Sequence, residues 1–412
     1  MRVPVAVPAA NASAPFDQAR SLVVPTGWRV EVWSRISGAR HALWTPSRTL
    51  LVTATGAGEL LELVPRSNPA SPPSVRVLVR GLTNPQGLAF DTIDKQRVLY
   101  LAESNRIDRF VWRGNGTIGR RTVVVSELPD ESASGDDVHR LKGIAVGPDH
   151  TIYVTVGSAW NANGADTTAS PPRGAVDAFD SSGAHPRVFA TGVRNGEGLA
   201  IGPDGALWAA VNERDNVAYP FHRSYGGLSD AYGQVVTSYV NENPPDEVAR
   251  LTTGRNLGWP FCNPSADIRP GDPRAGQDYD HPRFVRDAQT NPDGRSLDCS
   301  KLAAVERPIP AHSAPVSLTF LEGSTLPARW RGGALVGTHG SWDRNPPRAP
   351  AVLWLPWSTA KRTLAAATPL VSGFLAADGQ RWGRPVDAVP GLGGTLYVTD
   401  DTAGAVYRIT TR

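Results

Sequence analysis

The stretch Gly198-Leu-Ala-Ile-Gly-Pro-Asp-Gly-Ala-Leu-Trp-Ala209 decides the fold of this chain. Two short apolar runs flank a Gly-Pro-Asp-Gly turn, in which proline presets φ and glycine supplies a positive φ. Apolar runs joined by a turn of this chemistry predict a β-hairpin. The hairpin is the unit from which the rest of the chain can be interpreted.

The same unit recurs six times along the chain. It is clearest at 143–154 (GIAVGPDHTIYV), and all six copies lie at 41–52, 86–101, 143–154, 198–209, 316–337 and 386–398. Each copy is followed by another short apolar strand, such as 59–64 or 405–409. The equivalent positions Leu51, Tyr100, Tyr153, Trp208, Leu335 and Tyr397 are separated by 49, 53, 55, 127 and 62 residues. Repeats of this length with four strands each are typical of β-propeller blades.

The repeats predict an all-β fold, a six-bladed β-propeller of four-stranded antiparallel blades. The gap of 127 residues predicts loop insertions between blades 4 and 5, and this gap holds both cysteines. We expect the N- and C-terminal strands to share one blade and close the ring. Residues 1–26 are expected to be a flexible leader, and residues 27–412 a single propeller domain.

Composition narrows the possible partners and the compartment. The 42 basic and 39 acidic residues give a net charge of +3, and no Lys/Arg run occurs, so nucleic acid is not an expected partner. No apolar stretch approaches the roughly 18 residues needed for a membrane span. Cys262 and Cys299 lie in one loop-rich region. They could be two buried thiols, or a disulfide that contributes roughly 3–4 kcal/mol and indicates an extracytoplasmic or secreted protein.

Polar residues recur where predicted strands begin or end, and a propeller brings such positions together at its channel. They are Arg40, His139, Arg194, Asn195, 212–215, 339–344 and Arg384. Arginines that converge in this way favour an anionic ligand with several carboxylates or phosphates. Any one of them could equally be a surface or blade-bridging residue.

Several motifs in this order resemble the PQQ-dependent glucose/sorbosone dehydrogenase family, closest to its sorbosone and fungal pyranose dehydrogenase branch. They are His139 to Asp149, Gly192 to Ala200, Leu207 to Asp215, Asn256 to Cys262, Ala311 to Pro315, His339 to Arg344 and Gly383 to Val386. The resemblance covers about residues 27–411. It implies a soluble quinoprotein that oxidises a sugar or a related aldehyde or alcohol, using pyrroloquinoline quinone (PQQ) and Ca²⁺.

The resemblance also implies roles for single residues. His139 matches the family's general base, and Arg194 and Asn195 match its cofactor-contacting pair. Arg384 matches an arginine that holds a PQQ carboxylate, and Arg40, His339 and Arg344 match further cofactor contacts. The turn at Arg214 and Asp215 matches the segment whose backbone carbonyls bind Ca²⁺. An external electron acceptor, a quinone or a cytochrome, is implied as well.

The sequence departs from the family pattern close to the base. Ser158 stands where the glucose branch has an aspartate, and Lys142 stands where an arginine is usual. Two other readings of the chain remain. One is a metal-dependent, lactonase-like hydrolase, for which Glu213, Asp215 and Asp400 are the plausible acids. The other is a propeller that binds a carbohydrate or protein without catalysis.

Overall fold

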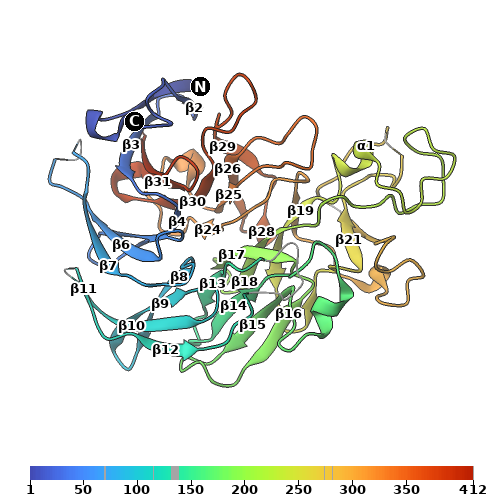
Figure 1. The fold of residues 1–412 in the computed structure, drawn as a ribbon, viewed down its shortest axis with the longest axis horizontal. Helices are drawn as coiled ribbons and strands as arrows, with labels where there is room; N and C mark the ends of the chain where they lie inside the picture. The colour runs from blue at the N-terminus through green and yellow to red at the C-terminus, as the bar shows by residue number, and fades with distance from the viewer. Residues whose placement is uncertain (69–70, 115, 131–138, 273, 281, 412) are drawn as a thin grey trace.

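The protein is all-β, with a propeller-like arrangement of sheets and few helices (Figure 1). The structure is a computed structural model that describes residues 1–68, 71–114, 116–130, 139–272, 274–280 and 282–411. The helices it describes are α1 (Thr237–Val240) and short 3-10 turns at Ala9–Asn11, Gly164–Thr168, Cys299–Lys301, Ala328–Trp330 and Leu392–Gly394. In these residues no helix is both long and apolar enough to cross a membrane.

Four separate antiparallel sheets of four or five strands follow the first four repeats. The first sheet holds β4 (Ala39–Trp44), β5 (Leu50–Ala54), β6 (Glu59–Val64) and β7 (Ser74–Val79). The second holds β8 (Leu88–Ile93), β9 (Gln96–Ala102), β10 (Ile107–Gly114), β11 (Thr117–Ile118) and β12 (Thr122–Val125). The third holds β13 (Ile144–Val146), β14 (Ile152–Val156), β15 (Ala175–Phe179), β16 (Arg187–Thr191) and a parallel β20 (Arg255–Asn256). The fourth holds β17 (Asn195–Ile201), β18 (Leu207–Asn212), β19 (Asp246–Leu251) and β23 (Arg307–Ile309).

The last two repeats share one ten-stranded sheet, so the prediction of six separate blades is wrong in its count. The fifth repeat gives β24 (Thr319–Phe320), β25 (Ala334–Thr338), β26 (Ala351–Leu355) and β29 (Thr368–Ser372). The sixth gives β30 (Pro385–Pro390), β31 (Thr395–Asp400) and β32 (Ala405–Thr410), and β3 (Arg29–Arg35) pairs with β32. The N- and C-terminal strands therefore lie side by side, as expected. The strands β1 (Arg2–Ala6) and β2 (Ser21–Val23) lie between β29 and β3 in this sheet, and so they link the strands of the fifth repeat to those of the sixth.

Residues 1–26, expected to be a leader, contribute two strands that pair with the rest of the fold. β1 pairs in parallel with β3, and β2 pairs with both β1 and β29. Phe16 packs edge-on against Trp382 and Tyr407. The segment pairs with the edges of β3 and β29. An unpaired strand edge would be open to pairing with other chains.

The insertions lie within the fourth sheet rather than after it. Residues 213–245 connect β18 to β19, and residues 252–306 connect β19 to β23. The second insertion carries the hairpin of β21 (Cys262–Ser265) and β22 (Arg283–Arg286), beside the disulfide Cys262–Cys299. The sequence missed β23 because its Arg-Pro-Ile run is short and has no turn signal. Both insertions project to the right in Figure 1.

The quoted turn forms the predicted hairpin between β17 and β18. The Gly202 amide donates to Ala206 O at 2.8 Å, and Gly205 adopts φ +75°. Trp208 is fully buried and packs against Phe320 and Trp357 of the next repeat. The first strands of the repeats (β4, β8, β13, β17, β24 and β30) contact one another in a closed circle. This circle brings their ends together.

Candidate functional site

The predicted site residues gather at one end of the circle of first strands. Arg194, Arg384 and His139 precede the first strands of three repeats, and His339 follows β25. First and second strands are antiparallel, so the start of one lies beside the end of the other. Residues from distant parts of the chain are therefore placed at the same end.

A buried network of arginines and acids occupies this end, here called the arginine network: Arg40, Gln86, Asn195, Glu197, His339, Arg384 and Asp401. The Arg40 guanidinium donates to Gln86 Oε1 at 3.1 Å, to Asp401 Oδ2 at 2.9 Å and to Glu197. Glu197 also accepts from Gln86 Nε2 at 3.0 Å and from Asn195 Nδ2 at 3.3 Å. Residues of the first, second, fourth and last repeats are thus joined.

Asp401 is the second acid of this network. Both of its oxygens accept from Arg384, at 3.0 and 2.9 Å. Burial alone would raise the pKa of Asp401, but the hydrogen bond from Arg384 and the charges of Arg40 and Arg384 lower it to about 2. Asp401 is therefore ionised at any working pH and orients the two arginines.

His339 lies at the edge of the same network with an unused ring nitrogen. Its Nε2 atom is 3.7 Å from Asp401 Oδ2 and, in the part of the chain described, has no hydrogen-bond partner. Burial, followed by the charges of Arg40 and Arg384, holds the pKa of His339 well below its usual range. A buried polar atom without a partner is costly, so a ligand that bonds this nitrogen would stabilise the site.

His139 is held by Ser158, and this contact fixes its tautomer. The Ser158 hydroxyl donates to Trp160 O at 2.8 Å, so its Oγ atom accepts from His139 Nδ1 at 2.9 Å. The Nδ1 atom then carries the proton, and Nε2 carries the lone pair. Gly157 permits this approach, because a Cβ there would lie 2.6 Å from His139 O. Ser158 therefore orients the His139 ring.

The surroundings of His139 keep its imidazole neutral. Burial, followed by the charge of Arg194, lowers the pKa of His139 to about 3, while Glu197 acts in the opposite direction. Because the charges of Arg194 and Glu197 both act on its imidazole, His139 lies close to the arginine network. Lys142 is fully buried and donates to the carbonyls of Pro129 and Arg140, both at 2.8 Å.

Arg194 connects His139 to the loop after β18. Its guanidinium donates to Asn161 O at 3.1 Å and Glu213 O at 2.9 Å, and lies 3.5 Å from Asp215 Oδ2. The Ser158 amide donates to Arg194 O at 2.9 Å. Arg194, which is predicted to contact a cofactor, thus also contacts the loop after β18 that is predicted to bind a metal.

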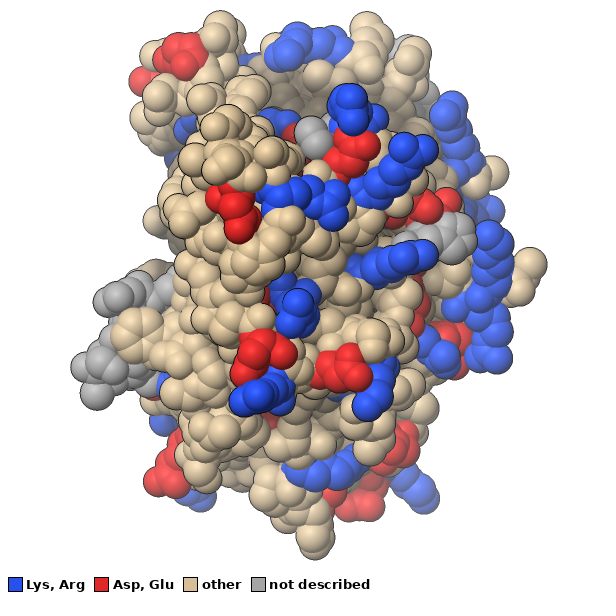
Figure 2. Space-filling model, turned by 90° about the vertical axis from the view of Figure 1, so that its right-hand side faces the viewer, with Lys and Arg blue, Asp and Glu red and all other residues tan. Residues whose placement is uncertain are grey.

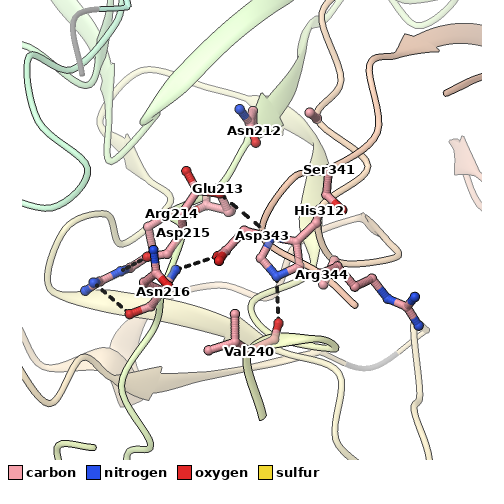
Figure 3. A network of polar contacts seen from close by, with 12 residues as sticks. Asn212, Glu213, Arg214, Asp215, Asn216, Val240, His312, Ser341, Asp343 and Arg344 are labelled. Carbon is pink, nitrogen blue, oxygen red and sulfur yellow. Dashed lines mark hydrogen bonds and ion pairs between the residues drawn. The ribbon is translucent and has the colours of Figure 1, made fainter. Parts of the chain in front are cut away.

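The loop at Arg214 and Asp215, expected to bind Ca²⁺ through backbone carbonyls, is held in place by several side chains. The Asp215 carbonyl accepts from Asn161 Nδ2 at 2.8 Å and from Arg214 Nε at 3.4 Å. The Arg214 guanidinium points away from the channel, to Asp287 at 2.5 Å and Gln289 at 2.6 Å. The loop instead presents the carboxylate of Asp215 toward His312 (Figure 3). The expected Ca²⁺ site at the backbone carbonyls of this loop stays a prediction.

Arg344 is not brought into the arginine network. Its guanidinium donates to Asn241 O at 3.1 Å, Pro346 O at 2.7 Å and Glu242 Oε1 at 2.7 Å. In Figure 3 its side chain extends away from Asp215 and Asp343. Arg344 therefore holds the turn after α1.

The sequence missed Gln86, Glu197 and Asp401. Each occupies a strand start or strand end equivalent to that of a predicted residue: Gln86 precedes β8, Glu197 lies early in β17, and Asp401 follows β31. The arginines have no acidic partner on their own strands, so nothing local in the sequence indicated that these acids would contact them. The position of each residue in its repeat was the available signal.

The acids considered for hydrolysis do not face a common position. Asp400 is fully buried and accepts from the amides of Thr402 and Ala403 and from the Tyr407 hydroxyl. Burial raises the pKa of Glu213 to about 8, so its carboxyl favours the protonated form. These two acids lie in the interior of the fold.

On the face that carries the insertions, acidic and basic side chains are interspersed (Figure 2).

Fold and site together define an all-β, propeller-like protein whose repeats bring buried arginines and two histidines to one end. The chain belongs to the TrAA12-like family, whose family model matches residues 22–412. It is thus related to the quinoprotein oxidoreductases, and the family resemblance read from the motifs is confirmed.

Solved structures share this fold over nearly the whole chain. The holo PQQ domain of pyranose dehydrogenase from Coprinopsis cinerea has a TM-score of 0.74 at 20% identity, covering 94% of this chain and 97% of that one. A family AA12 carbohydrate-active enzyme of Trichoderma reesei has a TM-score of 0.74 at 18% identity, covering 95% and 98%. The PQQ-bound aldose sugar dehydrogenase of Streptomyces coelicolor has a TM-score of 0.55 at 15% identity, covering 94% and 99%.

A curated relative matches part of the chain. An uncharacterized protein of Borreliella burgdorferi is 32% identical over 167 residues, which is 40% of this chain and 39% of that protein. The match therefore spans less than half of either protein.

Proposed function

We propose that the protein is a PQQ-dependent dehydrogenase that oxidises a sugar or a related aldehyde or alcohol. The observation that carries this proposal is the arrangement of Arg40, Arg384 and His339 beside a neutral His139 of defined tautomer. The printed names of the similar structures supply the cofactor and the substrate class.

The residues present fit a ligand with several carboxylates. Arg384 is bound to Asp401 but keeps about a third of its side chain exposed, and His339 Nε2 has no partner among the described residues. Arginine forks match carboxylate geometry, and Asp401 fixes their orientation before a ligand arrives. Arg384, Arg40, His339, Asn195 and Arg194 would hold the cofactor.

His139 would accept the proton of the reacting hydroxyl at Nε2. When bound, PQQ supplies the quinone carbon that accepts a hydride from the substrate carbon, so that the C–OH group becomes C=O. With Nδ1–H donated to Ser158, the imidazole keeps its orientation while Nε2 takes the proton. The charge of Arg194 lowers the basicity of His139, and this effect would be offset if Arg194 held an anionic ligand.

The proposal extends to the partners and the compartment. An external quinone or cytochrome would reoxidise the cofactor. The disulfide Cys262–Cys299 fits a secreted or periplasmic protein. Ca²⁺ is proposed as the second cofactor because one similar Trichoderma reesei structure is titled as a calcium structure. The loop of Arg214 and Asp215 is proposed to bind it through backbone carbonyls, and the Asp215 carbonyl also accepts from Asn161.

Reconstitution tests the proposal directly. The purified protein is titrated with PQQ by fluorescence quenching, with and without Ca²⁺, and then assayed by dye reduction with a panel of aldoses and sugar alcohols. We expect saturable PQQ binding at micromolar concentration and sugar-dependent dye reduction. The absence of PQQ binding would overturn the proposal. Binding without dye reduction on any substrate would support a non-catalytic binding protein instead.

A further inference from the structure

An exposed tryptophan lies three residues beyond His339 of the arginine network, on the loop after β25. Trp342 is 71% exposed, the highest exposed fraction among the large apolar residues described. A single exposed apolar residue is common, but this ring also forms part of the wall of a pocket. Three residues of extended chain span at most about 10–11 Å, so Trp342 stays close to the candidate site.

The pocket beside this ring, here called the outer pocket, has a volume of about 210 Å³. Its walls include Asn216, Val235, Thr237, Trp342 and Asn345. Val235 is 50% exposed and adds a second apolar surface. Asn216 follows Asp215, whose carboxylate lies 3.5 Å from the Arg194 guanidinium. The loops after β18 and β25 therefore run from the candidate site into the walls of the outer pocket.

The polar groups of the outer pocket suit a neutral ligand. Its charged walls in the described part of the chain are Asp343 and Arg344, which are of opposite sign. Arg344 donates to Glu242 Oε1 at 2.7 Å, and Asp343 Oδ2 accepts from the Asn216 backbone amide at 2.7 Å. The side-chain amides of Asn216 and Asn345 have no hydrogen-bond partner among the described residues. Each amide can donate and accept, so the pocket offers neutral hydrogen-bonding groups beside an aromatic ring.

The loop that carries Trp342 is held in place by its own bonds and by the end of α1. The Ser341 amide donates to Arg348 O at 3.2 Å, and the Arg348 amide donates to Ser341 Oγ at 3.1 Å. The Asn345 amide donates to Asn241 Oδ1 at 3.0 Å, and Asn241 Nδ2 donates to Asn345 O at 3.1 Å. The chain around the ring is therefore positioned before a ligand arrives, which lowers the entropy cost of binding.

We propose that the outer pocket is a second sugar subsite, in which Trp342 stacks on a neutral ring of an oligosaccharide whose reacting ring lies at His139. The C–H bonds on the face of a sugar ring carry partial positive charge and are attracted to the negative face of an indole. The amides of Asn216 and Asn345 would bond its hydroxyl groups. The inference rests on the proposed function and narrows its substrate to sugars of at least two linked rings.

Kinetics of the PQQ-loaded protein test this inference. KM and kcat are measured by dye reduction for glucose and mannose and for cello-, malto- and manno-oligosaccharides. We expect at least one oligosaccharide to have a KM roughly tenfold or more below that of its monosaccharide. Trp342→Ala should reduce this ratio of KM values roughly tenfold or more, because truncating a tryptophan at the centre of a binding site often costs this much. An interaction remote from the reacting carbon appears in KM rather than in kcat.

Matched variants separate the aromatic ring from the rest of the loop. Trp342→Phe keeps an aromatic face and should lose less of the preference for the oligosaccharide than Trp342→Ala. Asn345→Ala removes one amide and should reduce the preference roughly threefold to tenfold. Leu392→Ala changes another exposed apolar residue, 56% exposed, which follows β30 at the opposite end of the circle of first strands. It should leave the preference unchanged.

Calorimetry with the same oligosaccharides and protein without PQQ measures binding alone. The subsite is overturned if no oligosaccharide binds more tightly than its monosaccharide, or if Trp342→Ala leaves oligosaccharide binding unchanged. PQQ-dependent oxidation of monosaccharides would then still support the proposed function. Binding that depends on Trp342 without any dye reduction would support the subsite and contradict the proposed function. Slower electron transfer from Trp342→Ala to a cytochrome, at an unchanged ratio of KM values, would assign the ring to a protein partner and overturn the subsite.

Discussion

Two buried clusters of arginine and carboxylate in this protein have similar composition but different surroundings. The arginine network joins residues up to 361 positions apart, such as Arg40 and Asp401. The second, here called the second-sheet cluster, is made of Glu103, Arg106, Asp108 and Arg121, all in or beside β9, β10 and β12.

The electrostatics of the clusters differ in sign. In the arginine network the pKa of Asp401 is lowered to about 2. In the second-sheet cluster burial, together with the neighbouring Glu103, raises the pKa of Asp108 to about 7. In the first cluster both Arg40 and Arg384 contact Asp401, and His339 Nε2 has no hydrogen-bond partner among the described residues. In the second cluster Glu103 and Asp108 lie close together within one sheet. The residue types are similar, so what distinguishes the candidate site from a structural cluster is that it joins residues of several repeats.

The strongest test of this distinction is His139, the neighbour of the arginine network. His139→Ala should lower turnover by roughly 10²–10⁴-fold, because a positioned general base contributes about this much. The PQQ dissociation constant should change by less than about threefold. Stopped-flow dye reduction and PQQ fluorescence give the two quantities. Wild-type turnover in the variant would remove His139 from the chemistry.

Arg384 and Arg106 form a matched pair for cofactor binding. Their side chains are 37% and 29% exposed, and each contacts a buried acid. Arg384→Gln should weaken PQQ binding roughly 10–100-fold, since a charged hydrogen bond is worth about 1.5–3 kcal/mol. Arg106→Gln should leave it unchanged. Equal effects of the two substitutions on the PQQ titration would contradict the distinction between the clusters.

The two clusters should respond oppositely to pH. The folded pKa of Asp401 is depressed, so its stabilisation is present above pH 4 and is lost as the pH falls toward 2. The free energy of unfolding of wild type minus that of Asp401→Asn should therefore shrink by about 2 kcal/mol between pH 6 and pH 2–3.

For Asp108 the sign reverses. Its folded pKa is raised, so its stabilisation is present below pH 4 and is lost as the pH rises through 7. The free energy of unfolding of wild type minus that of Asp108→Asn should fall by about 4 kcal/mol between pH 4 and pH 8. Urea unfolding at five pH values measures both differences. Parallel slopes for the two variants would show that the clusters share one electrostatic character.

Ser158 gives the smallest expected effect. Ser158→Ala removes one hydrogen bond to His139 Nδ1, worth about 1 kcal/mol, so turnover should fall roughly fivefold. Ser158→Thr retains the hydroxyl and should restore turnover, which a merely structural role would not require. A shift in the pH dependence of turnover for Ser158→Ala, absent in Ser158→Thr, would locate the effect at the imidazole.

Much of the fold could be predicted because its signals are local. The Gly-Pro-Asp-Gly turn at 202–205 sets its own backbone angles, so the hairpin of β17 and β18 follows from the sequence. The pairing of β3 with β32 followed from the repeat. β1, β2 and β23 were missed, because short strands without turn residues are defined by the edges they cover.

The residues of the candidate site likewise fall into those that local sequence predicts and those that only the tertiary structure places. The sequence by itself determined His139 and the arginines at strand starts, because these positions repeat with the hairpin. Only the tertiary structure decided that Asp401 and Glu197 hold Arg40, that Ser158 orients His139 and that Arg344 lies elsewhere. It also brought Asp215, His312 and Asp343 together. The physical reason is that a turn depends on neighbouring residues, whereas a hydrogen bond across hundreds of residues depends on how the circle of strands closes.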